Sequence, residues 1–105
     1  MMAATILCLV AQVPDGATIV CADKTRIRIA GLETGTLVPK TAKSVLARLT
    51  MGKTISCLPA GNEGPFTAAM CTLPDKKDLA CTLIKAKAAV RSDIAWRRYS
   101  LPNCR

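Results

Sequence analysis

Residues 5–30 read TILCLVAQVPDGATIVCADKTRIRIA, and three strand signals follow one another in this stretch. The runs 5–12 and 18–22 are rich in aliphatic and β-branched residues, and Pro14-Asp-Gly between them is a strong turn signal. Two such runs around a tight turn predict a β-hairpin. Gly16 is expected to give this turn the backbone freedom that it needs.

The segment Arg26-Ile-Arg-Ile-Ala alternates strictly between arginine and isoleucine. Because successive side chains of a strand point to opposite faces, the alternation predicts a third strand. Its isoleucines are expected to face the core and its arginines to face outward. Outward arginines on a strand are candidate contacts for an anion, and the alternative is a solvated face.

The middle of the chain predicts a helix and a second hairpin. Apolar residues at helical spacing predict a helix over 40–51, which Gly52 ends. Strands are expected at 54–58 and 66–72, joined by the turn-rich segment 59–65.

Two capping signals organise the C-terminal part. Asp78 is expected to cap a helix over 79–89, and Ser92 or Asp93 a short third helix. The order of strands and helices matches an oligonucleotide-binding (OB-fold) barrel. The prediction is one domain over residues 1–105, mainly β with helices (α+β), with a five-stranded OB-fold barrel and two to three helices.

The charge balance points to a partner of opposite sign. Fifteen Lys and Arg residues stand against seven Asp and Glu, which gives a formal net charge of +8. Such a balance favours an anionic polymer, either nucleic acid or an acidic polysaccharide, and the alternative is a basic surface that only keeps the protein soluble. The candidate contacts are Arg26, Arg28, Lys40, Lys43 and Lys53, with Arg91, Arg97 and Arg98 in the tail.

Composition also excludes several classes. The chain has no histidine, which removes histidine-based acid–base and nucleophilic catalysis and the commonest zinc ligand. One Phe, one Trp and one Tyr are too few for a base-stacking platform. No apolar run approaches the ~20 residues that span a bilayer, so no transmembrane segment is expected.

The cysteines predict an oxidised protein. The chain has six of them, Cys8, Cys21, Cys57, Cys71, Cys81 and Cys104, and an even number in a short chain favours disulfides. Their pairing stays open, except that the second hairpin should make Cys57 and Cys71 a cross-strand pair or close neighbours. Buried free thiols are the alternative. Disulfides predict a periplasmic or secreted protein, with residues 1–12 as the first strand of a mature chain whose signal peptide has been removed.

Several stretches occur in an order that is shared with one known family. They are Asp15-Gly-Ala-Thr-Ile, residues 26–34 (RIRIAGLET), residues 42–54 (AKSVLARLTMGKT), Ala69-Met-Cys and residues 78–90 (DLACTLIKAKAAV). Over about residues 5–91 the chain resembles the staphylococcal nuclease family, especially its short exported bacterial members. The resemblance implies a nuclease-type barrel, and exported relatives carry cysteines at places like Cys57, Cys71, Cys81 and Cys104.

The family binds calcium with carboxylates, activates water with a further carboxylate and clamps phosphate with two arginines. By the resemblance, Arg28 is the first arginine, Glu33 stands for a metal-binding Asp, and Thr34 offers a backbone carbonyl. Asp15 is a possible substitute metal ligand. The alternative for Glu33 is an ordinary surface acid, and for Asp15 a residue of the turn.

The other groups of the family site are missing. The resemblance places Ala17 where the family has a metal-binding Asp, Thr36 where it has the catalytic Glu, and Phe66 near its second arginine. Gly35 replaces a proline. Because calcium affinity follows the number of charged ligands, the remaining set makes a poor site, and no cofactor is expected.

Three functions follow from this pattern. The first is a catalytically inactive member of the family, a pseudoenzyme that binds an anionic polymer, most favourably nucleic acid, through its basic surface. The second is a weak calcium-dependent phosphodiesterase or nuclease that uses Arg28, Glu33 and Asp15. The third is an exported structural or exopolysaccharide-associated binding protein.

Overall fold

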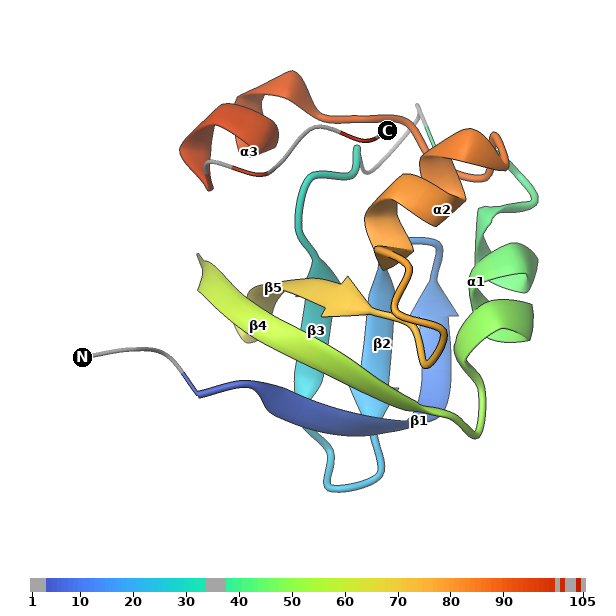
Figure 1. Ribbon diagram of the computed structural model, residues 1–105, viewed down its shortest axis with the longest axis vertical. Coiled ribbons are helices and arrows are strands. Elements are labelled where there is room, and N and C mark those ends of the chain that lie inside the picture. The colour runs from blue at the N-terminus through green and yellow to red at the C-terminus, as the bar shows by residue number, and fades with distance from the viewer. Residues whose placement is uncertain (1–3, 34–37, 100, 102–103, 105) are drawn as a thin grey trace.

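Five strands close into a barrel in the order β1-β2-β3-β5-β4 (Figure 1). The computed structural model describes residues 4–33, 38–99, 101 and 104. The strands are β1 (Ile6–Asp15), β2 (Thr18–Cys21), β3 (Arg26–Ile29), β4 (Thr54–Glu63) and β5 (Phe66–Thr72). The helices are α1 (Ala42–Thr50), α2 (Leu79–Lys85) and α3 (Asp93–Arg98).

The strand pairing is mixed. Neighbouring strands are antiparallel except β3 and β5, which run parallel with Ile27 opposite Thr67. The parallel pair is possible because β3 and the hairpin β4–β5 are joined through α1 and not by a short turn. This pair is one of the five that close the barrel. The predicted fold is confirmed at this level: the protein is mainly β with helices, and the barrel is compatible with an OB-like fold.

The core lies inside the barrel and under two helices. Ile19, Ile27 and Ile55 are fully buried, as the alternation in the strands predicts. Leu46 of α1 and Leu83 of α2 are fully buried in the same cluster. Figure 1 shows α1 beside the barrel and α3 above it, with α2 between them.

Three predicted boundaries are wrong by more than two residues, each for a local reason. Strand β1 continues through Pro14 to Asp15. Pro14 is exposed and lies at a register irregularity between Gln12 and Asp15, where the ladder requires no hydrogen bond from its nitrogen. Strand β4 runs to Glu63, because a bulge between Pro59 and Gly61 absorbs the residues expected to form a turn. Helix α2 ends at Lys85, since the N–H of Ala88 turns back to the carbonyl of Leu83.

Three disulfides fasten this framework. Cys8–Cys21 joins β1 to β2, Cys57–Cys71 joins β4 to β5, and Cys81–Cys104 ties α2 to the C-terminal segment. The expected pair Cys57–Cys71 is confirmed, because the two residues are direct partners in the β4–β5 ladder. This degree of oxidation fits a periplasmic or extracellular protein.

Helices that meet the length and hydropathy of a membrane span do not occur among the residues described above.

Candidate anion-binding cleft

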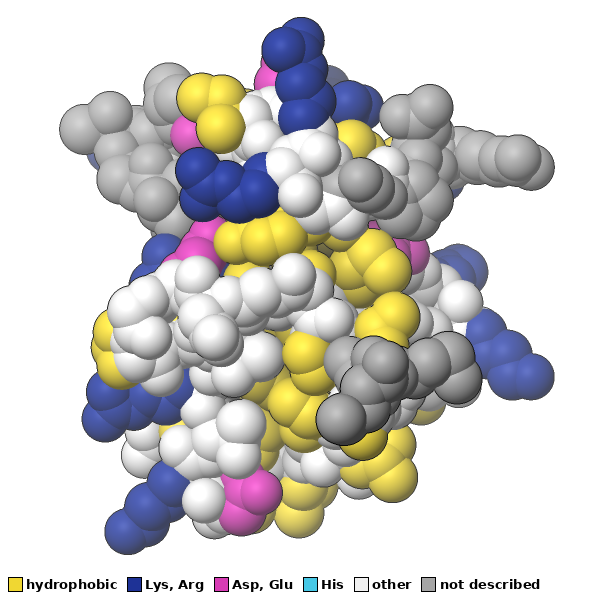
Figure 2. All heavy atoms as spheres, turned by 90° about the vertical axis from the view of Figure 1, so that its left-hand side faces the viewer, with side chains coloured by type: hydrophobic (Ala, Val, Ile, Leu, Met, Phe, Trp, Pro, Cys, Tyr) yellow, Lys and Arg dark blue, Asp and Glu magenta, His cyan; other side chains and the backbone are white. Residues whose placement is uncertain are grey.

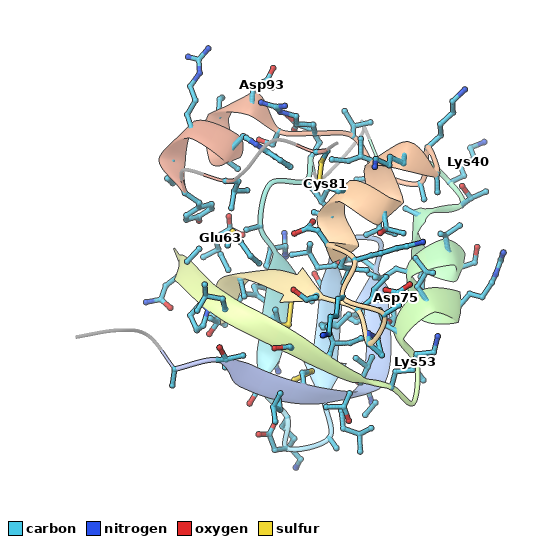
Figure 3. The ribbon with its side chains drawn as sticks, in the orientation of Figure 1. Lys40, Lys53, Glu63, Asp75, Cys81 and Asp93 are labelled. Atoms are coloured by element: carbon cyan, nitrogen blue, oxygen red, sulfur yellow. A yellow bond between two sulfur atoms is a disulfide. The ribbon has the colours of Figure 1, made fainter. Side chains whose placement is uncertain are left out.

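A cleft of about 330 Å³ lies where the end of β3, the end of β4 and helix α3 meet. Figure 3 shows Glu63 at the end of β4, beneath α3. The lining residues are Arg28, Ile29, Gly31, Leu32, Glu63, Ser92, Ile94, Ala95 and Arg98. The cleft therefore combines two arginines, one carboxylate and one hydroxyl with an apolar wall.

Helix α3 is held over the barrel by the segment after β3. The N–H of Ser92 donates to the carbonyl of Gly31 at 2.8 Å, and Leu32 and Arg91 form an antiparallel bridge. Gly31 has a φ of +93°, and a Cβ there would lie 2.7 Å from the ring of Trp96. Only glycine meets both conditions, so this residue lets α3 approach closely enough to wall the cleft.

Ser92 begins α3 as expected. Its Oγ accepts a hydrogen bond from the N–H of Ala95 at 3.3 Å, and Asp93 is the first helical residue. The guanidinium of Arg91 lies 4.5 Å from the centroid of the Trp96 ring. This packing fixes the start of the helix, and Arg98 then projects from its last turn at the mouth of the cleft.

Arg28 is the central charged side chain. It points outward from β3, is half-buried, and its Cζ lies 4.6 Å from the centroid of the Phe66 ring. Stacking on an aromatic face holds a guanidinium in one orientation. Its Nε is buried and has no hydrogen-bond partner among the described residues. A buried donor of this kind normally bonds to water or to a bound anion.

Thr18 lies directly opposite Arg28 in the β2–β3 ladder. It is fully buried, and its hydroxyl also lacks a hydrogen-bond partner within the described part of the chain. Two neighbouring polar groups, one on each strand, are therefore left unsatisfied at the same level of the sheet. Thr18 does not line the cleft, so only the Nε of Arg28 can be satisfied by a ligand there.

Glu63 faces the cleft without neutralising its arginines. Its Oε1 accepts a hydrogen bond from the hydroxyl of Tyr99 at 3.2 Å. Within the described ranges, the one ion pair below 4.0 Å joins Arg91 to Asp93. The charges of Arg28 and Arg98 therefore remain available to a ligand.

The predicted site residues are brought together only in part. Phe66 meets Arg28 directly. Ala17 is buried beside β3, where its carbonyl accepts from the N–H of Ile29 at 2.8 Å. Glu33 is half-buried, and its N–H donates to the carbonyl of Val90 at 2.7 Å. Thr36, with the neighbouring Thr34 and Gly35, lies outside the described residues.

Asp15 serves the turn after β1. Its Oδ1 accepts a hydrogen bond from the N–H of Ala17 at 2.8 Å. Across the described segments, no three acidic or cysteine side chains gather in one place. Ala17 has no side-chain oxygen, and the carboxylate of Asp15 is hydrogen-bonded to the backbone. These two residues therefore do not fit a calcium site.

The predicted basic contacts do not form one patch. Lys40, Lys43 and Lys53 are exposed in or next to α1, and Figure 3 shows Lys40 and Lys53 on the side of the molecule away from Glu63. Arg26 lines a different hollow from Arg28. On the face in Figure 2, Lys and Arg side chains stand mainly at the margins while hydrophobic side chains gather along the middle.

Sequence reasoning missed Gly31 and Ser92 as lining residues and did not place Arg98 near Arg28. The N-cap signal at Ser92 was readable, but a short helix carries no information about which part of a barrel it covers. The contact between Gly31 and Trp96 decides that placement, and it joins residues far apart in the sequence.

No protein-family model matches the chain, and no curated protein matches it either. The resemblance to the staphylococcal nuclease family therefore rests on the sequence stretches quoted above and stays a prediction.

Proposed function

We propose that this protein is a catalytically inactive barrel of the staphylococcal nuclease type that binds an anionic polymer, most favourably single-stranded nucleic acid, at the Arg28 cleft. The observation that carries the proposal is Arg28 itself. Its guanidinium is stacked on Phe66, and its buried Nε has no partner among the described residues. A pre-oriented guanidinium with free donors suits a phosphate oxygen.

The rest of the cleft supports electrostatic binding without base reading. Arg98 adds a second positive charge, and the apolar wall gives a polymer backbone a surface to rest on. The ring of Tyr99 packs against Gly61 and the ring of Phe66 is covered by Arg28, so each ring already has a neighbour where a base would stack. Binding should therefore be independent of sequence and should weaken with salt.

The proposed loss of catalysis follows from the residues that occupy the positions of the family's active site. Ala17 offers no carboxylate, and Phe66 presents a ring to Arg28 where a nuclease would present a second arginine. Catalysis of phosphoryl transfer depends on charge stabilisation and positioning, so these losses compound. We place the protein in the periplasm or outside the cell, which its disulfides favour.

The test measures binding of a fluorescent single-stranded DNA by anisotropy at two salt concentrations. Arg28→Gln should weaken binding about tenfold at low salt and reduce the salt slope by roughly 0.7, as for the loss of one phosphate contact. Arg98→Gln, on the exposed end of α3, should have a similar effect without touching the core. Arg48→Gln is the matched control, because it removes the same charge from α1, outside the cleft.

Three outcomes contradict the proposal. Equal losses in Arg28→Gln and Arg48→Gln would mean that only net charge matters. Calcium-dependent cleavage of the DNA that Glu33→Ala abolishes would show a working nuclease. If an acidic polysaccharide displaces the DNA from a shared site and binds much more tightly, the polymer is a polysaccharide and the nucleic-acid assignment is wrong.

A further inference from the structure

A row of leucines is exposed on the outer face of β1 and β4. Leu7 is 72% exposed, Leu9 47% and Leu58 40%, whereas the intervening Cys8 and Val10 face the core. Leu7 lies opposite Ser56 in the β1–β4 ladder, which places Leu58 on the diagonal next to it. We call Leu7, Leu9 and Leu58 the leucine strip. Single exposed leucines are ordinary, but three adjacent ones on one sheet face mark an interaction surface.

The leucine strip ends at a hollow of about 380 Å³ on the outer face of β1, β2 and the turn that follows. The two features adjoin, because the N–H of Ala22 in the hollow donates to the carbonyl of Leu9 at 2.8 Å. The lining residues of this basic hollow are Ala11, Gln12, Val20, Cys21, Ala22, Lys24 and Arg26. Its lining is thus about equally polar and apolar, and it includes the two cations Lys24 and Arg26.

Positive charge also borders the other side of the strip. The carbonyl of Lys53 accepts from the N–H of Val10 at 3.0 Å, so this exposed lysine lies beside Leu9. Asp23 is the acid next to Lys24 in the chain. Its carboxylate accepts from the N–H of Thr25, and this hydrogen bond lowers its pKa. Lys24 and Arg26 of the basic hollow therefore outnumber Asp23, the acid next to Lys24 in the chain.

A second copy of the chain is a poor occupant for this face. Two molecules with a formal net charge of +8 repel one another. In a dimer formed through this face, the lysines and the arginine around the strip would also lie close to positive charges of the other copy. The occupant should combine negative charge at the level of the basic hollow with an apolar layer at the level of the leucines.

We propose that the leucine strip and the basic hollow dock this protein on the surface of an anionic phospholipid bilayer. The leucines enter the boundary of the acyl chains, while Lys24, Arg26 and Lys53 contact lipid phosphates. This surface is separate from the Arg28 cleft, because the two share no lining residue. The proposal does not depend on the proposed function.

The experiment is co-sedimentation with vesicles of phosphatidylglycerol and phosphatidylcholine, compared with vesicles of phosphatidylcholine alone. The wild-type protein should sediment with the anionic vesicles only. The double variant Leu7→Ser/Leu9→Ser should bind at least about tenfold more weakly, because it loses two apolar side chains that would enter the bilayer. Both changed side chains are exposed, so we expect the fold to be retained. Lys24→Gln should lower the affinity several-fold, by roughly the value of one lysine near a charged surface.

Val90→Ser is the matched control. Val90 is 40% exposed, the same value as Leu58, and lines neither the basic hollow nor the Arg28 cleft. It should sediment like the wild type. The Leu7→Ser/Leu9→Ser variant should also keep the wild-type affinity for single-stranded DNA, so failure of this proposal is distinguishable from failure of the cleft proposal.

The proposal is overturned if the wild type does not sediment with anionic vesicles, or if Val90→Ser and the leucine variant lose equal affinity. It is also overturned if the wild type forms dimers in sedimentation velocity that the leucine variant abolishes, because the strip would then be an interface between copies.

Discussion

Gly16 and Ala42 touch where the turn after β1 meets the first residue of α1. A Cβ on Gly16 would overlap the Cβ of Ala42 and press on Val38 at 3.3 Å. Gly16 is not among the described glycines with positive φ, which are Gly31, Gly52 and Gly64. The expected backbone freedom is therefore not what this position uses. It needs the absence of a side chain, because α1 packs directly on the turn.

Gly16→Ala should lower the free energy of unfolding by about 1–3 kcal/mol, the usual range for overpacking. For a domain of this size each kcal/mol corresponds to a fall in Tm of about 4–8 °C, which thermal unfolding by circular dichroism would measure. The double variant Gly16→Ala/Ala42→Gly restores the space. It should lose less stability than the two single variants added together, and strict additivity would refute the contact.

At the scale of the element, α2 depends on a side-chain cap. The Oδ1 of Asp78 accepts from the N–H of Cys81 at 2.9 Å, and the hydroxyl of Thr82 donates to the carbonyl of Asp78 at 2.7 Å. Leu79 follows at once and is fully buried in the core. The cap therefore sets where a short helix begins and which of its faces enters the barrel mouth.

Asp78→Ala should lower the free energy of unfolding by about 1 kcal/mol, because the half-buried N–H of Cys81 in the first turn of α2 loses its acceptor. Asp75→Ala is the control. The carboxylate of Asp75 also accepts a backbone hydrogen bond, from Lys77 at 3.1 Å, but in an exposed turn, so its loss should stay within about 0.5 kcal/mol. If urea unfolding gives the same loss of free energy for both variants, the cap of α2 adds no more stability than an exposed turn does.

Elements with a local signal were predictable and those with a distant cause were not. The alternation in β3 and the caps at Asp78 and Ser92 act over a few residues, and the structure has them as expected. The extension of β4 depends on a bulge opposite β5, which the prolines and glycines of 59–65 conceal. The parallel pairing of β3 with β5 depends on closure of the whole barrel.

The candidate site followed the same division. Arg28 was predictable, because the period of a strand sets the side to which it points. Its neighbours were not: Arg98 arrives on a helix whose position depends on Gly31 and Trp96. Lys40 and Lys53 were grouped with Arg28 by charge alone, and charge carries no information about distance.

At the scale of the whole molecule, the three disulfides differ in burial. Cys8, Cys57 and Cys71 are at most 1% exposed and Cys21 is 4% exposed, whereas Cys81 and Cys104 are half-buried. The buried pairs each clamp two neighbouring strands. The third bridge, Cys81–Cys104, instead joins α2 to the C-terminal segment.

Mild reduction should therefore open Cys81–Cys104 first, because a reductant reaches an exposed sulfur without unfolding the barrel. Brief treatment with dithiothreitol, alkylation and mass spectrometry of the peptides would show label on Cys81 and Cys104 while the strand bridges stay closed. Earlier labelling of Cys57 and Cys71 would contradict this order.

The disulfides also have a simple order along the chain. Each joins two successive cysteines, 8 with 21, 57 with 71 and 81 with 104, so no bridge encloses or crosses another. A chain that enters an oxidising compartment N-terminus first presents its cysteines in that same sequence. Pairing each cysteine with the next one to arrive gives the native set directly. A chain with this pairing can therefore be oxidised while it is being exported, without the rearrangement of non-native bridges.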